Sequence, residues 1–369
     1  MDKLLNVIKS LLGIICLVIT AGILLAGLWP FNFLPENKVK WLQDQNGVQF
    51  YGQAIIYSTI PSFQFFTIPV KSFSIELCLQ PITDESSHIG HIFSFLDEHG
   101  SETFFIGQWR SDLLLGKGIH GKDTYREMGI GDDVLKKGDK RFVTITSGVY
   151  GTKAYVDGIL LKSDPRFQLF SMNEKPSGRI LLGNSPTGSE YWTGNLLSLA
   201  IYDRALTGEE VSQHSHGSKR SAEEGHVSLY LFDERSGTLA HDSAGGHQLV
   251  IPPEFEVLKK AILVPPWKDF RFTHSYIIDI LTNILGFIPF GFFLSAYLWR
   301  RKAQLKLRLI LVSIIVAGCV SLSIELIQVY LPTRCSQLMD VITNILGAVL
   351  GVALFFLCKR RFIQPFLGI

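Results

Sequence analysis

The chain has few charged residues for its length. Lys, Arg, Asp and Glu make up 18% of its 369 residues, whereas hydrophobic residues make up 47%. This composition excludes an intrinsically disordered chain, and it argues against nucleic-acid binding, which needs a dense positive surface. The mean hydropathy of +0.24 is high for a soluble protein. We therefore expect part of the chain to lie in a membrane.

Cysteine is also scarce, with five residues in the whole sequence. Cys16, Cys319 and Cys358 lie in or beside apolar runs, Cys335 lies in a short turn, and Cys78 is alone in the polar middle of the chain. A single cysteine cannot form an internal disulfide, so the middle of the chain must be held together by a hydrophobic core.

Charge is distributed unevenly along the chain. Residues 31–275 carry 24 Lys/Arg and 29 Asp/Glu, a net charge of −5, whereas residues 276–369 carry nine and three, a net charge of +6. An acidic middle between apolar, basic ends is typical of a membrane protein with a large inserted domain.

Four apolar segments are long enough to cross a bilayer core of roughly 30 Å. They are residues 1–30, 276–299, 307–331 and 338–358. A cleaved signal peptide is the alternative for the first, because Lys3 and Lys9 precede its apolar core. The run is long for a signal peptide, and the residues around Trp29 are too large for a typical cleavage site.

Basic residues beside these spans predict their orientation. They occur between the second and third spans and in the tail 359–369 (Arg300, Arg301, Lys302, Lys306, Arg308, Lys359, Arg360 and Arg361). Short loops rich in Lys and Arg stay in the cytoplasm. We expect both termini inside and residues from about 31 to 275 outside.

The outer segment has the pattern of a β-sandwich. Short apolar or alternating runs, such as residues 73–79 and 142–146, are separated by Gly, Asp, Asn and Pro, and Asp157-Gly158 is typical of a tight hairpin turn. Many strands without intervening helices predict an all-β jelly-roll sandwich over residues 48–250. Residues 31–47 are expected to form a linker, and residues 251–275 a connector back to the membrane.

Several short motifs in this segment resemble a known superfamily. They are Phe73-Ser-Ile-Glu-Leu, Tyr155-Val-Asp-Gly, Leu182-Gly-Asn, Trp192-Thr-Gly-Asn-Leu and Ile201-Tyr-Asp-Arg-Ala-Leu-Thr. In this order they resemble LamG-like domains of the concanavalin A-type lectin/glucanase superfamily. The resemblance implies a two-sheet jelly roll that binds a ligand, often a glycan.

The sandwich lacks the pattern of a glycosidase or of a metal site. Glycoside hydrolysis usually needs two carboxylates about 5–9.5 Å apart, and Glu76 is the single acid in its strand. Acidic pairs such as Glu209-Glu210 are interpreted as solvated charge, and His214 and His216 as surface residues. No catalytic residue, metal ligand or cofactor is assigned; calcium bound by loop oxygens stays an open alternative.

The membrane segments contain an internal repeat. Residues 279–286 (DILTNILG) and 340–347 (DVITNILG) are nearly identical octapeptides, and each begins a span. Asp and Asn are one helical turn apart, so Asp279 and Asn283 share a face, as do Asp340 and Asn344. The glycine three residues later favours close helix packing.

The last 94 residues contain three acids, and all lie in or beside apolar spans. Polar residues gather at the same predicted end of these spans, and we predict a ligand-binding site there (Asp279, Asn283, Ser321, Glu325, Gln328, Arg334, Asp340 and Asn344). Charges in hydrocarbon must be paired or hydrated. Two interpretations stay open: Arg334 neutralises carboxylates and only stabilises the bundle, or the cluster forms a pocket for a polar headgroup.

This half resembles the VanZ family. The resemblance lies in Leu28-Trp-Pro-Phe-Asn-Phe33, Gly286-Phe-Ile-Pro-Phe-Gly291, Ser323-Ile-Glu325-Leu-Ile-Gln328, Pro332-x-Arg334 and the octapeptide from Asp340. It implies a bacterial cytoplasmic-membrane protein, with Glu325, Gln328, Arg334, Asp340 and Asn344 as the site. The family is named for raised resistance to the glycopeptide teicoplanin. The LamG-like domain is inserted between the first and second spans.

These patterns predict a membrane protein that binds an envelope glycan through its sandwich and a polar lipid-linked envelope component, or a glycopeptide-related ligand, through its spans. The expected partners are the bilayer and these ligands, without nucleic acid. One alternative is an adhesion or structural module that the spans only anchor. The other is an intramembrane enzyme that uses Glu325 or Asp340 as an acid–base group; enzymatic activity is left open, although no nucleophile stands out.

Overall fold

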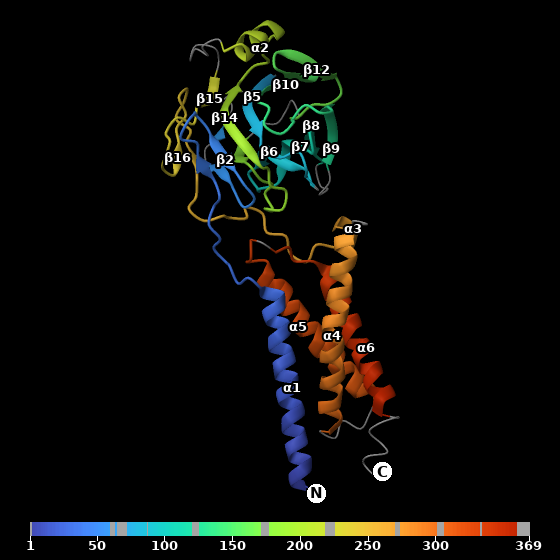
Figure 1. Ribbon diagram of the computed structural model, residues 1–369. Coiled ribbons are helices and arrows are strands. Elements are labelled where there is room, and N and C mark those ends of the chain that lie inside the picture. Colours follow the sequence, from blue (N-terminus) through green and yellow to red (C-terminus); the bar gives the residue numbers. More distant parts are fainter. Residues whose placement is uncertain are drawn as a thin grey trace. The chain divides into compact units, whose positions relative to one another are not determined.

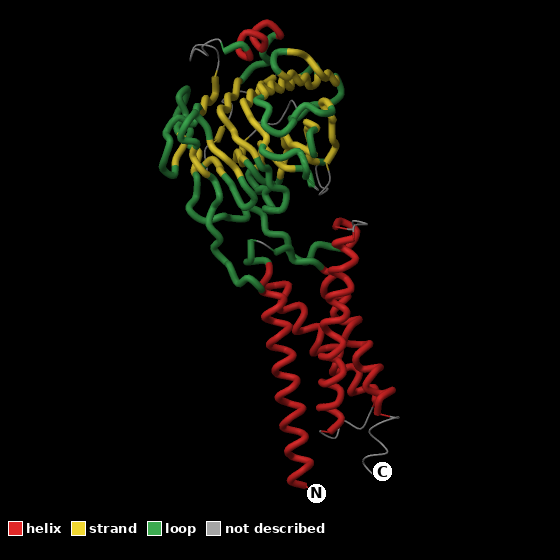
Figure 2. The backbone as a smooth tube through the Cα atoms, in the orientation of Figure 1, coloured by secondary structure: helices red, strands yellow, loops and turns green. Residues whose placement is uncertain are grey.

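The computed structural model describes residues 2–59, 63–64, 72–86, 88–119, 125–170, 177–217, 226–269, 274–300, 306–332 and 334–359. The chain forms two compact units, Leu34–Lys259 and Met1–Phe33 with Lys260–Ile369. The first is built mainly of strands, with the helix Gly208–Ser215 beside them, and the second mainly of helices (Figures 1 and 2). Four of the basic residues that predicted the orientation lie outside the described residues: Arg301, Lys302, Arg360 and Arg361.

The first unit is a sandwich of two antiparallel sheets. Over the described residues, sheet I has the order β1-β2-β14-β5-β10-β11-β12 with β15 beside β14, and sheet II has the order β16-β17-β3-β13-β6-β7-β8-β9 with β4 beside β13. The strands of sheet I are β1 (Lys40–Trp41), β2 (Val48–Phe50), β5 (Ser72–Pro81), β10 (Arg141–Gly148), β11 (Gly151–Val156), β12 (Ile159–Asp164), β14 (Gly194–Tyr202) and β15 (His226–Tyr230). Those of sheet II are β3 (Ile56–Ser58), β4 (Phe63–Gln64), β6 (Gly90–Asp97), β7 (Glu102–Trp109), β8 (Asp112–Gly118), β9 (Tyr125–Gly131), β13 (Ser177–Leu182), β16 (Leu239–Ala240) and β17 (Leu249–Val250).

Alternation along the strands builds the core between the sheets. In β5, Ile75 and Leu77 join a buried cluster that also contains Phe93 of sheet II. The opposite face of β5 is buried as well, because a second cluster joins Tyr202 of β14 to Val211 of helix α2 (Gly208–Ser215). The predicted all-β sandwich is confirmed, and sheet I has apolar contacts on both faces.

The hairpin turn follows from its two residues. Asp157 has a φ of 51° and Gly158 a φ of 83°, between β11 and β12. This left-handed backbone is tolerated by Asp and favoured by Gly, as the sequence predicts.

The sandwich extends beyond the predicted limits of residues 48 and 250. Lys40 and Trp41, in the segment expected to be a linker, pair with Gln49 and Val48 to form an extra strand. In the segment expected to be a connector, Phe255 is buried in a cluster of the sandwich. These short segments were assigned to linkers because neither has a long apolar or alternating run.

The described part of the second unit contains four long helices and one short one. They are α1 (Asp2–Leu28), α4 (His274–Arg300), α5 (Lys306–Gln328) and α6 (Leu338–Cys358), with the short α3 (Pro266–Asp269) before α4. Within the described residues, the four long helices are long and apolar enough to cross a membrane. The fold class is confirmed, but α5 ends at Gln328 rather than at Leu331. The end is consistent with Pro332, because proline disfavours helical backbone in the residue before it.

Glycines allow α4 and α6 to pack closely. A side chain at Gly347 of α6 would overlap the backbone of Ile284 in α4, and one at Gly291 of α4 would overlap the backbone of Ala348. The two helices therefore meet through backbone surfaces, as small residues permit in membrane helices.

Helix α1 changes its neighbour along its length. Ile19 and Ile23 pack with Phe287 of α4, whereas Leu28 and the nearby Leu24 pack with Ile324 of α5. Near its C-terminal end, α1 therefore packs on α5, and residues 279–286 of α4 are left largely uncovered.

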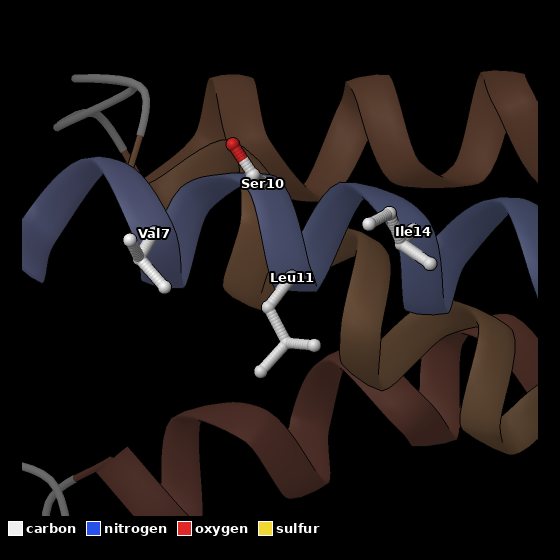
Figure 3. A pocket seen from close by; sticks show the side chains of 4 residues that line it. All are labelled: Val7, Ser10, Leu11 and Ile14. Carbon is white, nitrogen blue, oxygen red and sulfur yellow. The ribbon is translucent and has the colours of Figure 1, made fainter.

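A shallow hollow of about 380 Å³ lies beside the N-terminal half of α1 (Figure 3). Val7, Ser10, Leu11 and Ile14 line it, so its surface is almost entirely apolar. It lies well away from the polar residues at the other end of α1, since 16 residues of helix separate Leu11 from Gly27, or about 24 Å.

Candidate ligand sites

Three polar side chains occupy one buried face at the C-terminal end of α5. Ser321, Glu325 and Gln328 are 0%, 1% and 7% exposed. Their spacing of four and three residues places them on one side of the helix. This side faces protein, so the sequence interpretation that these groups share a face agrees with the structure.

The Glu325 carboxylate is held by the start of α6. Its Oε2 accepts a hydrogen bond from the backbone N–H of Gln337, the N-cap residue of α6, at 2.7 Å. The Ser336 hydroxyl is a second hydrogen-bond partner, and its oxygen accepts from the Leu263 N–H at 3.2 Å. A helix N-terminus stabilises negative charge, so this position suits a carboxylate.

Further hydrogen bonds connect the helices around Glu325. The Asn344 amide donates to Ser321 Oγ at 2.9 Å, and the Gln328 amide donates to the Gly27 carbonyl at 2.8 Å. Arg334 donates to the Trp29 carbonyl through Nε at 3.2 Å and Nη2 at 2.9 Å. Within the described residues, Arg334 makes no ion pair with Glu325, so it bonds to the end of α1 rather than directly neutralising this carboxylate.

Two buried amide oxygens have no hydrogen-bond partner among the described residues. They are Oε1 of Gln328 and Oδ1 of Asn344. Both side chains are more than nine-tenths buried, with 7% and 5% exposed. Each amide already uses its nitrogen within the protein, so the cluster has two acceptors available for a ligand.

The predicted site residues fall into two groups. Asp340 lies in the first turn of α6 and is close enough to Glu325 for their charges to repel. Asp279 is exposed and Asn283 half-buried on α4, and among the described residues neither has a hydrogen bond to the cluster. Six of the eight predicted residues thus lie on α5, α6 and the turn between them, whereas Asp279 and Asn283 lie on α4.

Several contributors to this site could not be identified from the sequence. The Gly27 and Trp29 carbonyls and the Gln337 N–H are backbone groups, which every residue carries. Ser336 is not among the predicted site residues, yet it contacts Glu325. Its place just before an apolar run was a weak signal, since serine often precedes helices.

In the sandwich, Glu76 is the centre of a sealed polar cluster. It is fully buried and accepts hydrogen bonds from Tyr202 at 2.8 Å and Thr144 at 3.4 Å. His214 of α2 lies 3.0 Å from its Oε1. His214 is 6% exposed, so its interpretation as a surface residue is wrong: α2 folds over sheet I and buries it. Because Glu76 does not reach the surface, its contacts serve to attach α2.

Glu210 lies in the first turn of α2 and caps the start of this helix. It accepts two hydrogen bonds from Arg204, at 3.0 and 2.7 Å, and forms a capping box with Thr207. The hydrogen bonds from Arg204 are the main reason that its pKa falls to about 2. The interpretation of Glu210 as solvated charge is therefore wrong, because its charge is used to fix the start of the helix.

Exposed aromatic side chains flank the start of β6 in sheet II. Trp109 is the last residue of β7, and its neighbour Gln108 pairs with Gly90 at the start of β6. On the other side of β6, Tyr191 forms a backbone bridge with His91. The exposed fractions of Trp109 and Tyr191 are 43% and 41%. The Arg110 guanidinium lies 5.2 Å from the Trp109 ring, and the His88 ring lies 4.5 Å from that of Tyr191. Flat aromatic surface beside polar groups suits a sugar ring.

Metal ligands are not grouped in the described part of the chain. It contains no cluster of three or more His, Cys, Asp or Glu side chains placed to hold an ion.

Two protein-family models match the chain. One, described as VanZ/LLP1, matches residues 195–359. The other, described as the concanavalin A-like lectin/glucanases superfamily, matches residues 56–212. Both resemblances read from the sequence are confirmed: the chain carries a VanZ-like region and a LamG-like domain. The VanZ match begins inside β14 and covers α4 to α6, but it does not include α1.

Solved structures resemble the sandwich only distantly. A heptameric SAP-like pentraxin from Limulus polyphemus is 16% identical with a TM-score of 0.37, over 59% of this chain and 94% of its own. A candidate carbohydrate-binding protein from Bacteroides ovatus is 14% identical with a TM-score of 0.40, over 59% of this chain and 58% of its own. A Trypanosoma rangeli sialidase is 13% identical with a TM-score of 0.37, over 48% and 28%. This chain thus covers less than two thirds of the last two. No curated protein matches the chain.

Proposed function

From a VanZ-like region and a carbohydrate-binding-type domain in one membrane protein, we propose a protein of the bacterial cytoplasmic membrane that binds envelope molecules in two places. The sandwich binds a cell-envelope glycan. The polar cluster around Glu325 binds the polar part of a lipid-linked envelope component. Both termini lie in the cytoplasm, and the sandwich and the cluster lie on the outer side.

The observation that carries this proposal is the pair of buried oxygens on Gln328 and Asn344 that have no hydrogen-bond partner among the described residues. A buried polar atom without a hydrogen bond costs roughly 1–3 kcal/mol. Bilayer hydrocarbon offers no donor to compensate for this cost. A cluster that only stabilised the bundle would be expected to satisfy its own groups, so two orphan acceptors support a bound ligand with hydroxyl, amide or amine donors.

The orientation is supported by the basic residues described above, on the rule that short basic loops stay inside. The same rule places the N-terminal ends of α4 and α6 toward the outer face. The bacterial membrane and the link to teicoplanin rest on the VanZ resemblance alone.

The membrane site can be tested on the full chain in a glycopeptide-susceptible strain. Wild type, Glu325→Gln and Arg334→Ala are compared at matched membrane levels, with Ser323→Ala as control, because Ser323 is exposed and bonds only to its own helix. Co-purified lipid is measured by mass spectrometry, and teicoplanin susceptibility is recorded. Loss of a bound lipid in Glu325→Gln and Arg334→Ala, but not in Ser323→Ala, supports the site. Equal lipid retention in all four would contradict it.

The glycan site can be tested with the same full chain in nanodiscs. We expect Tyr191→Ala and Trp109→Ala each to weaken binding to envelope glycan fragments about tenfold, since stacking on an aromatic ring is lost. Tyr150→Ala is the matched control, because Tyr150 is 88% exposed in the turn between β10 and β11 of sheet I. Unchanged binding in both test variants would place the glycan elsewhere.

A further inference from the structure

The sandwich contains a second buried histidine–glutamate pair, formed by His91 of β6 and Glu102 of β7. The two residues are 4% and 8% exposed, and Nδ1 of His91 lies 2.9 Å from Oε1 of Glu102. The imidazole stacks on the Phe105 ring, with centroids 3.8 Å apart, and the Ser94 hydroxyl lies 3.3 Å from Nδ1. These contacts fix both the position and the orientation of the imidazole.

This pair differs from Glu76 and His214 in the atoms that it leaves without a partner. Both oxygens of Glu76 accept hydrogen bonds inside the sandwich. Among the described residues, Oε2 of Glu102 has no hydrogen-bond partner, and the hydrogen bonds of the His91 ring all involve Nδ1. A carboxylate can only accept, so the His91 proton lies on Nδ1, and the neutral imidazole presents Nε2 as an acceptor. The pair therefore keeps two acceptors that lack a donor.

His91 lies on the same side of sheet II as Trp109 and Tyr191. Phe104 of β7 belongs to the core between the sheets, so alternation places Phe105 and Trp109 on the outer face. Because His91 stacks on Phe105, it lies on the outer face too. Tyr191 forms a parallel backbone bridge with His91, and residues paired in this way point to the same side.

The two exposed aromatic residues flank His91 at a defined spacing. Their neighbours Gln108 and Trp192 are joined by a hydrogen bond of 2.7 Å from Trp192 Nε1 to Gln108 Oε1. The backbones that carry Trp109 and Tyr191 lie on opposite sides of β6. With a strand spacing of about 4.8 Å, they are about 10 Å apart across the sheet. A glycan that contacts both rings therefore has at least two sugar units.

The unpaired nitrogen of His91 is turned toward this aromatic pair. The two nitrogens of an imidazole point away from each other, and Nδ1 is turned toward Glu102, the first residue of β7. Nε2 is therefore turned toward the other end of β7, where Trp109 lies. A sugar that stacks its apolar face on Trp109 or Tyr191 carries hydroxyl groups around its edge, and these are the donors that Nε2 lacks.

We propose that Nε2 of His91 accepts a hydrogen bond from a hydroxyl group of an oligosaccharide stacked on Trp109 and Tyr191. His91 is then a ligand-binding residue, and Glu102 is a positioning residue that orients the imidazole. The inference rests on the proposed function and deepens its glycan site. It names the ligand class as a chain of two or more sugars with an unsubstituted hydroxyl group at this position.

The test uses the full chain in nanodiscs, with cellohexaose and chitohexaose as probes and binding measured by titration calorimetry. We expect at least one probe to bind, and its monosaccharide to bind at least tenfold more weakly, because one sugar can contact one aromatic ring only. A fully methylated form of the bound probe keeps the sugar rings but has no O–H donor, and it should also bind at least tenfold more weakly. Equal binding of the monosaccharide would overturn the two-ring ligand, and equal binding of the methylated form would overturn the hydrogen bond.

Two substitutions of His91 distinguish a ligand contact from a contact that only stabilises the sandwich. His91→Asn keeps an N–H donor near the Nδ1 position for Glu102 but removes Nε2, and it should weaken binding at least tenfold. His91→Gln loses the contact with Glu102 but places an amide near the Nε2 position, so it should bind more tightly than His91→Asn. A role in stability alone predicts the reverse order. His241→Asn is the matched control, because His241 is exposed and lies 3.2 Å from Glu234.

The outcomes separate this inference from the proposed glycan site. Binding that is weakened in Trp109→Ala and Tyr191→Ala but unchanged in His91→Asn would overturn the role of His91 and leave the glycan site. No binding of either hexasaccharide, or binding that none of these variants changes, would overturn the proposed site as well.

Discussion

The two octapeptides at the starts of α4 and α6 have nearly the same sequence and different surroundings. In α6, Gly347 lies against the backbone of α4, and Asn344 donates to Ser321. In α4, the equivalent Gly286 has open space around it, and Asn283 is half-buried without a hydrogen bond to the described residues. The Asp-Asn-Gly side of the second copy is thus a packing face, whereas the same side of the first copy is open.

This difference shows what a repeated motif does and does not determine. Both copies place Asp, Asn and Gly on one side of a helix, because that follows from helical geometry. Whether that side meets another helix depends on the path of α1, which leaves α4 and joins α5 near this end. Local sequence therefore determines which residues share a helical face. The segments packed around the helix determine whether that face is buried or open.

Replacing the two glycines with leucine should give the largest difference between the two octapeptides. Gly347→Leu should destabilise the helical unit by about 3 kcal/mol, because the side chain would collide with the α4 backbone. Gly286→Leu should change stability by less than about 0.5 kcal/mol, since its surroundings are open. Unfolding of the full chain in mixed detergent–SDS micelles measures both. Equal losses for the two variants would show that the copies are packed alike.

Substitutions of Asn283 and Asn344 should differ less in their effect on stability. Asn344→Leu removes the hydrogen bond to Ser321 and should cost about 1 kcal/mol in the same unfolding experiment. Asn283→Leu removes no bond within the described residues and should be neutral or slightly stabilising. A larger loss for Asn283→Leu than for Asn344→Leu would contradict the assignment of the open face.

Glu209 and Glu210 are a similar pair in the sandwich, because they are adjacent identical residues with different neighbours. The pKa of Glu210 is lowered from 4.5 to about 2, so its contribution to stability is present above pH 4.5 and is lost as the pH falls toward 2. Solvent screening limits that contribution to less than about 1 kcal/mol, because both Glu210 and Arg204 are about one-third exposed.

The corresponding measurement is unfolding of the full chain, followed by tryptophan fluorescence, at pH 7 and near pH 2. Glu210→Gln should be less stable than wild type at pH 7 and nearly equal to it near pH 2. Glu209→Gln removes the same charge but no ion pair to Arg204, and it should follow wild type at both pH values. A loss that is unchanged at low pH would mean that the Glu210 charge is not its cause.

Much of the fold could be predicted from patterns that report directly on burial. The four spans follow from long apolar runs, and strands such as β5 and β10 follow from alternation and turn residues. The predicted end of the third span was three residues too far, since hydropathy does not register where a helix turns away. Segments 40–41 and 251–259 were assigned to linkers because two-residue strands and single buried aromatics leave no periodic signal.

The residues proposed for the site could be selected from the sequence, but their hydrogen bonds could not. Acids are so rare after residue 275 that Glu325 and Asp340 stand out by chemistry alone. The partners of Glu325 and Arg334 are largely backbone groups, which no sequence pattern reveals. For the same reason the sequence offered ion pairing by Arg334 as one interpretation, whereas the structure places this residue on the Trp29 carbonyl.

The sequence is sufficient to identify the apolar segments, the segments in which apolar and polar residues alternate, and the polar residues that share a helical face. These properties depend only on residue type and on the period of the backbone. Only the packing of the folded chain shows that His214 is buried on Glu76 and that Gly347 is packed while Gly286 is open. It also shows that Gln328 and Asn344 each keep an oxygen without a hydrogen bond among the described residues. Each of these depends on which distant segment lies alongside. Contact between distant segments is set by packing of the whole unit, and no local pattern contains it.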